Sequence, residues 1–232
     1  MIEPVSEDAV LITLADAIDD SLPALLCRLA QSIRDKEFPW LIDLVPSYTT
    51  MLVFYDPLSV DHRTVIARLR TIIDAEMSAP GHQQPIAGDL VELPVYYSDE
   101  SGPDLAALAA ETGLDAAEVI RRHTTREYRV HALGFAPGFA FMGEVDPTIA
   151  LPRKQTPRKR VPAGSVGIAN RQTAVYPQAS PGGWQIIGRC PTPLFDLQTL
   201  SLLKVGDRVR FRAINREDFL AAGGQLTETA AS

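Results

Sequence analysis

The chain has 232 residues, 46% hydrophobic and 22% charged, a composition typical of a globular protein in one large domain or two small ones. It lacks an apolar run near the roughly 18 residues that span a bilayer and a positively charged secretory start, so we expect a cytoplasmic protein without a membrane partner. The net charge of −7 argues against nucleic-acid binding, and the two cysteines, Cys27 and Cys190, are too few for a disulfide framework.

Residues 1–98 alternate between strand and helix patterns. The pattern predicts, in order, a strand at 10–14, a helix at 22–33, two strands at 41–46 and 48–56, a helix at 61–73 and a strand at 90–98. The order βαββαβ is typical of a ferredoxin-like module, whose helices cover one face of an antiparallel sheet. We therefore predict a ferredoxin-like α/β domain over residues 1–98.

The segment after this domain contains two short helical patterns joined near Gly113, with Asp115 placed to cap the second helix. This spacing superficially matches a helix-turn-helix, but the second helix begins with acidic residues instead of the basic ones expected for DNA binding. We interpret the segment as a helical bridge.

From Tyr128 onward, short strand patterns alternate with turns rich in glycine and proline, which favours a barrel or a sandwich. Residues 99–232, the bridge included, therefore form a second predicted domain, and the fold class is α+β. The charge also changes along the chain, because residues 1–100 carry 17 acidic and 6 basic side chains, whereas residues 101–232 carry 12 acidic and 16 basic. The basic second part is the better candidate for binding anions.

A basic run from 153 to 160 is the first candidate site. It contains Arg153, Lys154, Arg158, Lys159 and Arg160, and a proline directly precedes Arg153 and Arg158. Because proline fixes the local backbone, we expect these two arginines to be held in defined directions and to bind a carboxylate or phosphate through their planar forks of donors. The alternative is a solvated charge run.

Two glycine-rich turns supply further candidates. In PAGSVGI, residues 162–168, Ser165 follows Gly164 without the Gly-x-Ser-x-Gly elbow of a nucleophilic serine, so we expect a hydrogen-bond donor or a simple turn serine. In SPGGW, residues 180–184, paired glycines would let backbone amides approach a ligand, and Trp184 would stack on that ligand or plug a barrel. Neither turn matches a Walker or dinucleotide phosphate loop, so an ATP-binding site is not evident in this sequence.

His123 ends the second helical pattern, beside two arginines and just before the glycine-rich part. A histidine at this place suits general base catalysis or hydrogen bonding to an anion, and a structural role at the helix end is the alternative. His131, inside a strand pattern, is a weaker candidate. We expect no metal site, because the sequence lacks an HExxH motif, paired cysteines and a dense His/Asp cluster.

Several ordered motifs carry a family resemblance: HTTREYRV, GFAPGF, LPR followed by PRKRVPAGSVGIA, QTAVYP and SPGGWQIIGR. They resemble the family that comprises the B subunit of 5-oxoprolinase, allophanate hydrolase subunit 1 and the Kip kinase inhibitor, and the match covers most of the chain. The resemblance implies an N-terminal ferredoxin-like module followed by a C-terminal cyclophilin-like β-barrel. The same motifs contain Gln172, Tyr176 and Arg189, which we add to the candidate site.

This resemblance implies the B subunit of an ATP-dependent 5-oxoprolinase, which converts 5-oxo-L-proline to L-glutamate together with separate A and C subunits and is inactive alone. ATP would be used by the assembled complex. One alternative is a carboxyltransferase subunit that moves a carboxyl group from carboxybiotin, held on other chains, to a urea-like acceptor. Another is a non-enzymatic inhibitor of a histidine kinase, whereas a proline isomerase is least expected, because a fold does not transfer its active site.

We predict a catalytic role for Arg153 and Arg158, which would stabilise developing charge, and for His123, which would transfer a proton. The predicted substrate-binding residues are Gly164, Ser165, Gln172, Tyr176, Gly182, Gly183, Trp184 and Arg189.

Overall fold

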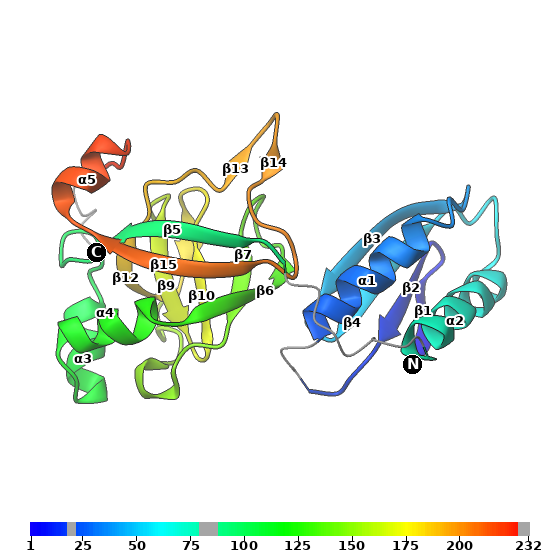
Figure 1. Ribbon diagram of the computed structural model, residues 1–232, viewed down its shortest axis with the longest axis horizontal. Helices are drawn as coiled ribbons and strands as arrows, with labels where there is room; N and C mark the ends of the chain where they lie inside the picture. The colour runs from blue at the N-terminus through cyan, green and yellow to red at the C-terminus, as the bar shows by residue number, and fades with distance from the viewer. Residues whose placement is uncertain (18–21, 79–87, 227–232) are drawn as a thin grey trace. The chain divides into compact units, whose positions relative to one another are not determined.

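A computed structural model describes residues 1–17, 22–78 and 88–226, and Figure 1 shows its ribbon. The chain divides into two compact units, Met1–Gly88 and Asp89–Ser232, each with its own hydrophobic core. Within the described part of the chain, no helix is both long enough and apolar enough to cross a membrane.

The first unit is an antiparallel sheet with two helices. Its strands are β1 (Ile2–Ser6), β2 (Ala9–Thr13), β3 (Leu41–Ser47) and β4 (Thr50–Tyr55), in the order β1-β2-β4-β3. The helices are α1 (Leu22–Arg34) and α2 (His62–Ser78). Their apolar faces are buried in the same cluster as the strands, with Leu26 from α1, Leu69 from α2 and Val53 from β4 all fully buried.

The predicted βαββαβ module is wrong in its last strand. The strand at Leu90–Tyr96 (β5) belongs to the second unit and not to the first. β5 pairs in parallel with β15 (Arg208–Ile214) and antiparallel with β12 (Gln185–Arg189), and its residues Leu93 and Val95 are buried in the core of that unit. The edge of the first sheet beside β2 is occupied by β1. Alternating apolar residues predict a half-buried strand, but they do not specify which sheet the strand joins.

The second unit contains a closed β-barrel. Besides β5, β12 and β15, its strands are β6 (Glu127–Leu133), β7 (Ala140–Gly143), β9 (Ser165–Ala169) and β10 (Gln172–Val175). Among the described residues, seven strands follow the order β6-β15-β5-β12-β9-β10-β7, and β7 pairs back with β6 to close the ring. The predicted barrel is confirmed over the sandwich alternative, because closure joins both edges of one sheet.

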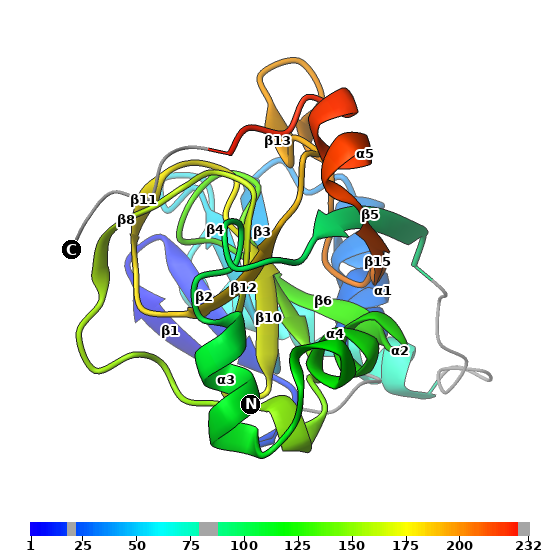
Figure 2. The ribbon, with the colours of Figure 1, turned by 90° about the vertical axis from the view of Figure 1, so that its left-hand side faces the viewer.

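Helices and short hairpins surround the barrel. α3 (Leu105–Thr112) and α4 (Ala116–Thr124) lie side by side, and α4 packs against β15 (Figures 1 and 2). The predicted helix cap is confirmed, because the Asp115 side chain accepts a hydrogen bond from the Glu118 N–H at 2.7 Å. The smaller elements are β8 (Arg158–Val161), β11 (Ser180–Gly182), β13 (Phe195–Asp196), β14 (Leu200–Ser201), a 3₁₀ turn at Pro147–Ile149 and α5 (Arg216–Ala221).

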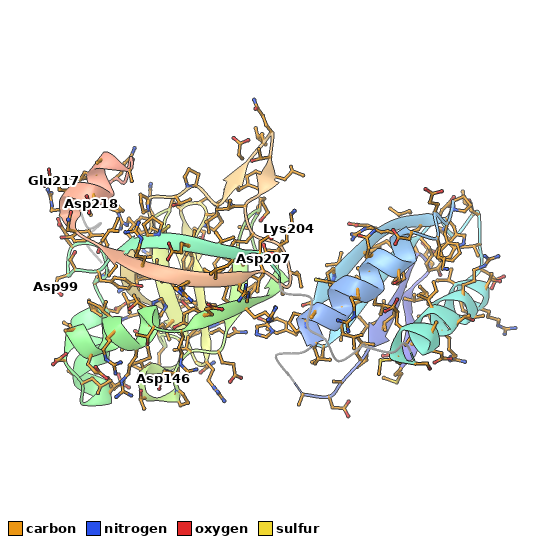
Figure 3. The ribbon with its side chains drawn as sticks, viewed as in Figure 1. Asp99, Asp146, Lys204, Asp207, Glu217 and Asp218 are labelled. Atoms are coloured by element: carbon orange, nitrogen blue, oxygen red, sulfur yellow. The ribbon has the colours of Figure 1, made fainter. Side chains whose placement is uncertain are left out.

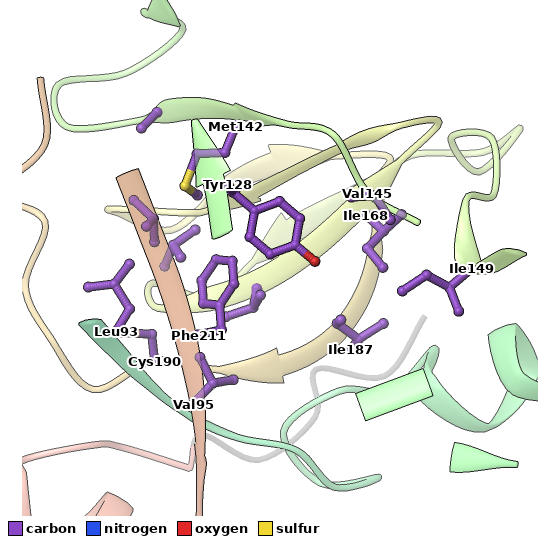
Figure 4. Packing of buried hydrophobic residues seen from close by; sticks show 14 of the residues in the cluster. Leu93, Val95, Tyr128, Met142, Val145, Ile149, Ile168, Ile187, Cys190 and Phe211 are labelled. Atoms are coloured by element: carbon purple, nitrogen blue, oxygen red, sulfur yellow. The ribbon is translucent and has the colours of Figure 1, made fainter. Parts of the chain in front are cut away.

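Apolar side chains fill the barrel, which is therefore a packed core. Figure 4 shows Tyr128 from β6 beside Phe211 from β15, with ring centroids 5.5 Å apart. Met142, Ile168 and Ile187 from three other strands are fully buried in the same cluster. Such a close-packed interior gives the loops around it a rigid support.

The turn that leads into β15 is fixed by a buried carboxylate. Asp207 accepts a hydrogen bond from the Lys204 backbone N–H at 2.7 Å, and Figure 3 labels both residues. The Asp207 carbonyl accepts a second one from the Val130 N–H of β6 at 2.9 Å. Burial raises the pKa of the Asp207 carboxyl above its ordinary value.

Candidate functional site

A small pocket of about 110 Å³ on the barrel unit, called the aromatic pocket below, joins three separate sequence motifs. The GFAPGF loop contributes Phe135 and Phe139, the basic run contributes Arg153, and the SPGGW turn contributes Gly183 and Trp184. Phe141, Tyr176, Pro181 and Gly182 complete the lining. The predicted candidates that share this pocket are Arg153, Tyr176, Gly182, Gly183 and Trp184.

The walls of the aromatic pocket are held in edge-to-face contacts. The ring of Phe139 lies 5.3 Å from that of Tyr176 and 5.8 Å from that of Trp184, in both cases nearly perpendicular. Its centroid is 4.8 Å from that of Phe141. Aromatic pairs at these distances contribute about 0.5–1.5 kcal/mol each beyond their buried area, so the wall is rigid and apolar. Trp184, buried in this wall, therefore both packs and faces the pocket.

The guanidinium of Arg153 supplies a positive charge at this apolar wall. Its central carbon lies 5.8 Å from the Trp184 ring centroid, within the range of a cation–π contact. Arg153 is exposed, and among the described residues no carboxylate forms an ion pair with it. The pocket thus combines a small apolar volume with one planar fork of donors that suits a carboxylate.

A buried carboxylate, Asp104, organises the rest of the basic run. Its Oδ1 accepts hydrogen bonds from Lys154 Nζ and Arg158 Nη2, both at 2.7 Å, and its Oδ2 accepts one from the Ile186 backbone N–H at 2.7 Å. Burial alone would raise the pKa of Asp104, but the hydrogen bonds from Arg158, Lys154 and Ile186 outweigh it and hold the pKa below its ordinary value. The loop that carries Arg153 is therefore anchored to the barrel at the residue that follows it.

Arg153 and Arg158 both follow a proline, but only Arg158 is bound by Asp104. Arg158 and Lys154 each form an ion pair with Asp104, whereas Arg153 lines the aromatic pocket. Sequence reasoning missed Asp104, because the only local signal is its place at the start of a helix and its partners lie 50, 54 and 82 residues away. A ligand-binding role for Arg158 stays a prediction, and its contacts favour a positioning role.

The paired glycines of SPGGW have different surroundings. A Cβ on Gly182 would lie 2.3 Å from the Tyr176 hydroxyl oxygen, so any larger residue there would have to displace the Tyr176 ring. That oxygen also accepts a hydrogen bond from the Trp184 backbone N–H, and burial raises the pKa of Tyr176. At Gly183 the nearest atom would be the Lys154 carbonyl oxygen at 3.4 Å, an ordinary contact. The group that closely approaches Gly182 is thus the Tyr176 side chain, whereas the sequence predicts a ligand there.

A second cavity of about 320 Å³ contains two other candidates, Gly164 and Arg189, and shares Tyr176 with the aromatic pocket. Gly164 has a φ of 78°, and a Cβ there would lie 2.3 Å from the Cys190 carbonyl oxygen. Arg189 is buried, which lowers its pKa, and its Nη1 donates to the Gln225 carbonyl at 2.9 Å. Gly164 therefore serves backbone packing, and Arg189 contacts the C-terminal segment.

His123 lies in the barrel core and lines neither cavity. Its ring stacks on Phe211 with centroids 4.6 Å apart. Nδ1 is 2.8 Å from the Tyr97 hydroxyl, and Nε2 is 2.9 Å from Thr173 Oγ1. Burial lowers the pKa of His123 to about 3, so the ring is neutral near pH 7. This environment favours a structural role over proton transfer.

The remaining candidates lie outside both cavities. Ser165 is fully buried at the start of β9, and Gln172 is half-buried at the start of β10. Across residues 1–17, 22–78 and 88–226, no three His, Cys, Asp or Glu side chains come together in a group that would hold a metal ion.

Comparisons with known proteins identify what the chain is similar to. The family model of the carboxyltransferase domain, subdomain C and D, matches residues 1–202. The chain is 38% identical over 228 residues to the B subunit of 5-oxoprolinase from Bacillus subtilis (strain 168), covering 95% of each protein.

Two solved structures are similar over most of the chain. The crystal structure of TTHA0988 matches with a TM-score of 0.77 and 34% identity, covering 93% of this chain and 40% of that one, so this chain spans about two fifths of the longer protein. The urea carboxylase of Kluyveromyces lactis matches with a TM-score of 0.72 at 17% identity, covering 95% of this chain and 22% of that one. The second match shows a shared fold alone.

Replacing Gly182 by alanine tests the packing of the aromatic pocket. Since the new methyl group would overlap the Tyr176 hydroxyl, we expect Gly182→Ala to lower the free energy of unfolding by about 1–3 kcal/mol. Gly183→Ala is the matched control and should change it by less than about 0.5 kcal/mol. Urea denaturation of both variants measures the difference, and equal effects would show that the Tyr176 contact is not limiting.

Replacing His123 tests its burial in the neutral form. The unfolded chain takes up a proton on this residue near pH 6.5, whereas the folded chain does so only near pH 3. Stability is therefore full above pH 6.5 and falls as the pH drops towards 3, by about 1.4 kcal/mol per pH unit. His123→Gln should remove this slope in denaturation curves between pH 6.5 and 4. An unchanged slope would mean that the folded protein protonates His123 readily.

Proposed function

The chain belongs to the carboxyltransferase-domain family, subdomain C and D, and from this membership we propose that it is the B subunit of an ATP-dependent 5-oxoprolinase. The observation that carries the proposal is similarity over the whole length, with 38% identity across 95% of both chains to a protein named as the B subunit of 5-oxoprolinase. The reaction would open 5-oxo-L-proline to L-glutamate in a complex with A and C subunits, and we place it in the cytoplasm.

The aromatic pocket supports this substrate class. 5-Oxoproline is a small ring with one carboxylate, and the pocket offers a small apolar volume beside one arginine. We assign Arg153 to the substrate carboxylate and the rings of Phe139 and Trp184 to the lactam ring. The backbone N–H of Gly183, which lines the pocket, is our candidate for an amide donor to developing charge.

The amide of an unstrained lactam is a poor electrophile, so its cleavage needs activation, which ATP would supply in the complex. The residues of the two cavities do not fit ATP. The aromatic pocket is far smaller than a nucleotide site, and the second cavity presents a buried arginine that is already bound to the Gln225 carbonyl. We propose that ATP binds to the partner subunits.

His123 takes no part in the chemistry that we propose. Its ring is neutral, buried and hydrogen-bonded at both nitrogens to Tyr97 and Thr173. The general base would then come from a partner subunit. In this account the barrel unit binds and orients the lactam, and the partner brings the group that moves the proton.

The finer fold assignment belongs to the same proposal. We assign the barrel to the cyclophilin-like class, on the basis of the family resemblance. We assign the first unit to the ferredoxin-like class, with β1 in the edge position that β5 would otherwise occupy. Carboxyl transfer from carboxybiotin is the less favoured function, because the similarity to urea carboxylase, at 17% identity, is one of fold.

An activity assay of the assembled complex tests the proposal. We expect no turnover of 5-oxoproline by this chain with ATP, and turnover once the cognate A and C subunits are added. Arg153→Ala should reduce kcat/KM by about 10- to 100-fold, the loss of one charged hydrogen bond, with Tm unchanged because Arg153 is exposed.

Lys159→Ala is the matched control in the same basic run, because Lys159 is exposed and lines neither cavity. It should keep kcat/KM within about twofold. Robust turnover by the chain alone would overturn the subunit assignment. Equal losses of kcat/KM in the two variants would instead contradict the assignment of Arg153 to the substrate carboxylate.

A further inference from the structure

A short hairpin beside the aromatic pocket exposes leucines to solvent. β13 and β14 project from the barrel unit in Figure 1, and the leucines lie at and after the turn between them. Leu197 is 86% exposed and Leu200 62%, and Leu202 is exposed as well. A run of exposed apolar side chains on a projecting element is a feature of interaction sites.

The hairpin is held rigidly. Asp196 Oδ1 accepts hydrogen bonds from the Gln198 N–H at 2.8 Å and the Thr199 N–H at 3.1 Å, which fix the turn that carries Leu197. At the base, the Leu202 N–H donates to the Leu194 carbonyl at 3.0 Å, and Leu194 is buried in the barrel core. The leucines are therefore presented on a preorganised scaffold, which lowers the entropy cost of binding.

The hairpin adjoins the loop that forms one wall of the aromatic pocket. A Cβ on Gly138 would lie 2.8 Å from the Cβ of Phe195, so the GFAPGF loop and the hairpin are in contact. On that loop Phe135 is 66% exposed, and its ring lies edge-on to Phe139 at 5.2 Å. Phe135, Leu197, Leu200 and Leu202 are called the leucine surface below.

Backbone strain accompanies the exposure. Phe135 has a φ of 73° and Leu200 a φ of 62°, values in the left-handed region that bulky side chains rarely adopt. Both residues thus combine an unfavourable backbone with an apolar side chain in water. Strain of this kind persists where the surrounding structure imposes it and gathers at ligand and switch sites.

We infer that the leucine surface docks a partner subunit. This partner corresponds to the part of the TTHA0988 chain that does not match this protein. This inference rests on the proposed function, in which the chain works with other subunits. The domain fills 40% of the TTHA0988 chain, so the related protein carries it in one polypeptide with a larger remainder. In the proposed function, the counterpart of that remainder is a partner subunit, which would offer an apolar groove to the leucines.

Docking at this surface has a consequence for the aromatic pocket. Phe135 belongs both to the leucine surface and to the pocket wall, so a partner that covers Phe135 also reaches the pocket. The pocket would then be completed and shielded from water only in the complex. This placement lets the partner present a general base to the bound lactam.

A binding measurement with purified proteins tests the inference. The probe is the cognate subunit that aligns with the remainder of the TTHA0988 chain, and isothermal titration calorimetry measures its Kd for this chain. The variant Leu197→Asp/Leu200→Asp should raise Kd by about 30-fold or more, as expected for central apolar contacts. Leu58→Asp is the matched control, because Leu58 is 96% exposed in the first unit, and should keep Kd within about twofold.

A second variant guards against misfolding of the first. Leu200→Gly removes the side chain and suits the positive φ, so it should fold normally and still raise Kd by about tenfold. An unchanged Kd in both variants, or no binding by the wild-type chain, would overturn the inference. Hairpin-dependent binding without 5-oxoproline turnover would instead overturn the proposed function and leave the docking surface in place.

Discussion

The hydrogen bonds to the buried carboxylate of Asp104 are the interaction on which the candidate site depends. One side chain at the start of α3 binds the basic loop through Lys154 and Arg158 and the strand β12 through the Ile186 N–H. A buried carboxylate is costly unless it is paired and fully hydrogen-bonded, and here the three donors meet that need. Because Lys154 and Arg158 are both paired with Asp104, Arg153 is left as the charge that faces the aromatic pocket.

The sequence predicts local features better than long-range pairings. Local residue types predict Asp115 as a helix cap and a barrel or sandwich of short strands after Tyr128. The choice of a barrel comes from the family resemblance, and both the cap and the barrel are found. The strand at Leu90–Tyr96 is correctly predicted as a strand but falls in a different sheet from the predicted one, since periodicity carries no information on the partner strand. The prolines before Arg153 and Arg158 could not show that the two arginines have different roles. That difference arises because Arg158 binds Asp104, about 50 residues earlier in the chain.

The position of the His123 ring could not be predicted from local residue patterns either. Its place after two arginines resembles a catalytic position, but the last turn of α4 points the ring into the core against Phe211. Only the packing of α4 on β15 decides this, and no local pattern records it. In the function that we propose, the aromatic pocket and the exposed leucines belong to a composite site. This chain would bind a small acid there, and its partner would supply the general base that the buried, neutral His123 does not provide.

The most direct test of this account is the free energy of unfolding of Asp104→Asn, measured by urea denaturation beside Glu127→Gln. Glu127 also contacts two arginines, Arg208 and Arg210, but at the surface. We predict a loss of about 3 kcal/mol for Asp104→Asn, which leaves partly buried cations unpaired, and less than about 1 kcal/mol for Glu127→Gln. Equal small losses in the two variants would contradict the claim that Asp104 holds the site together.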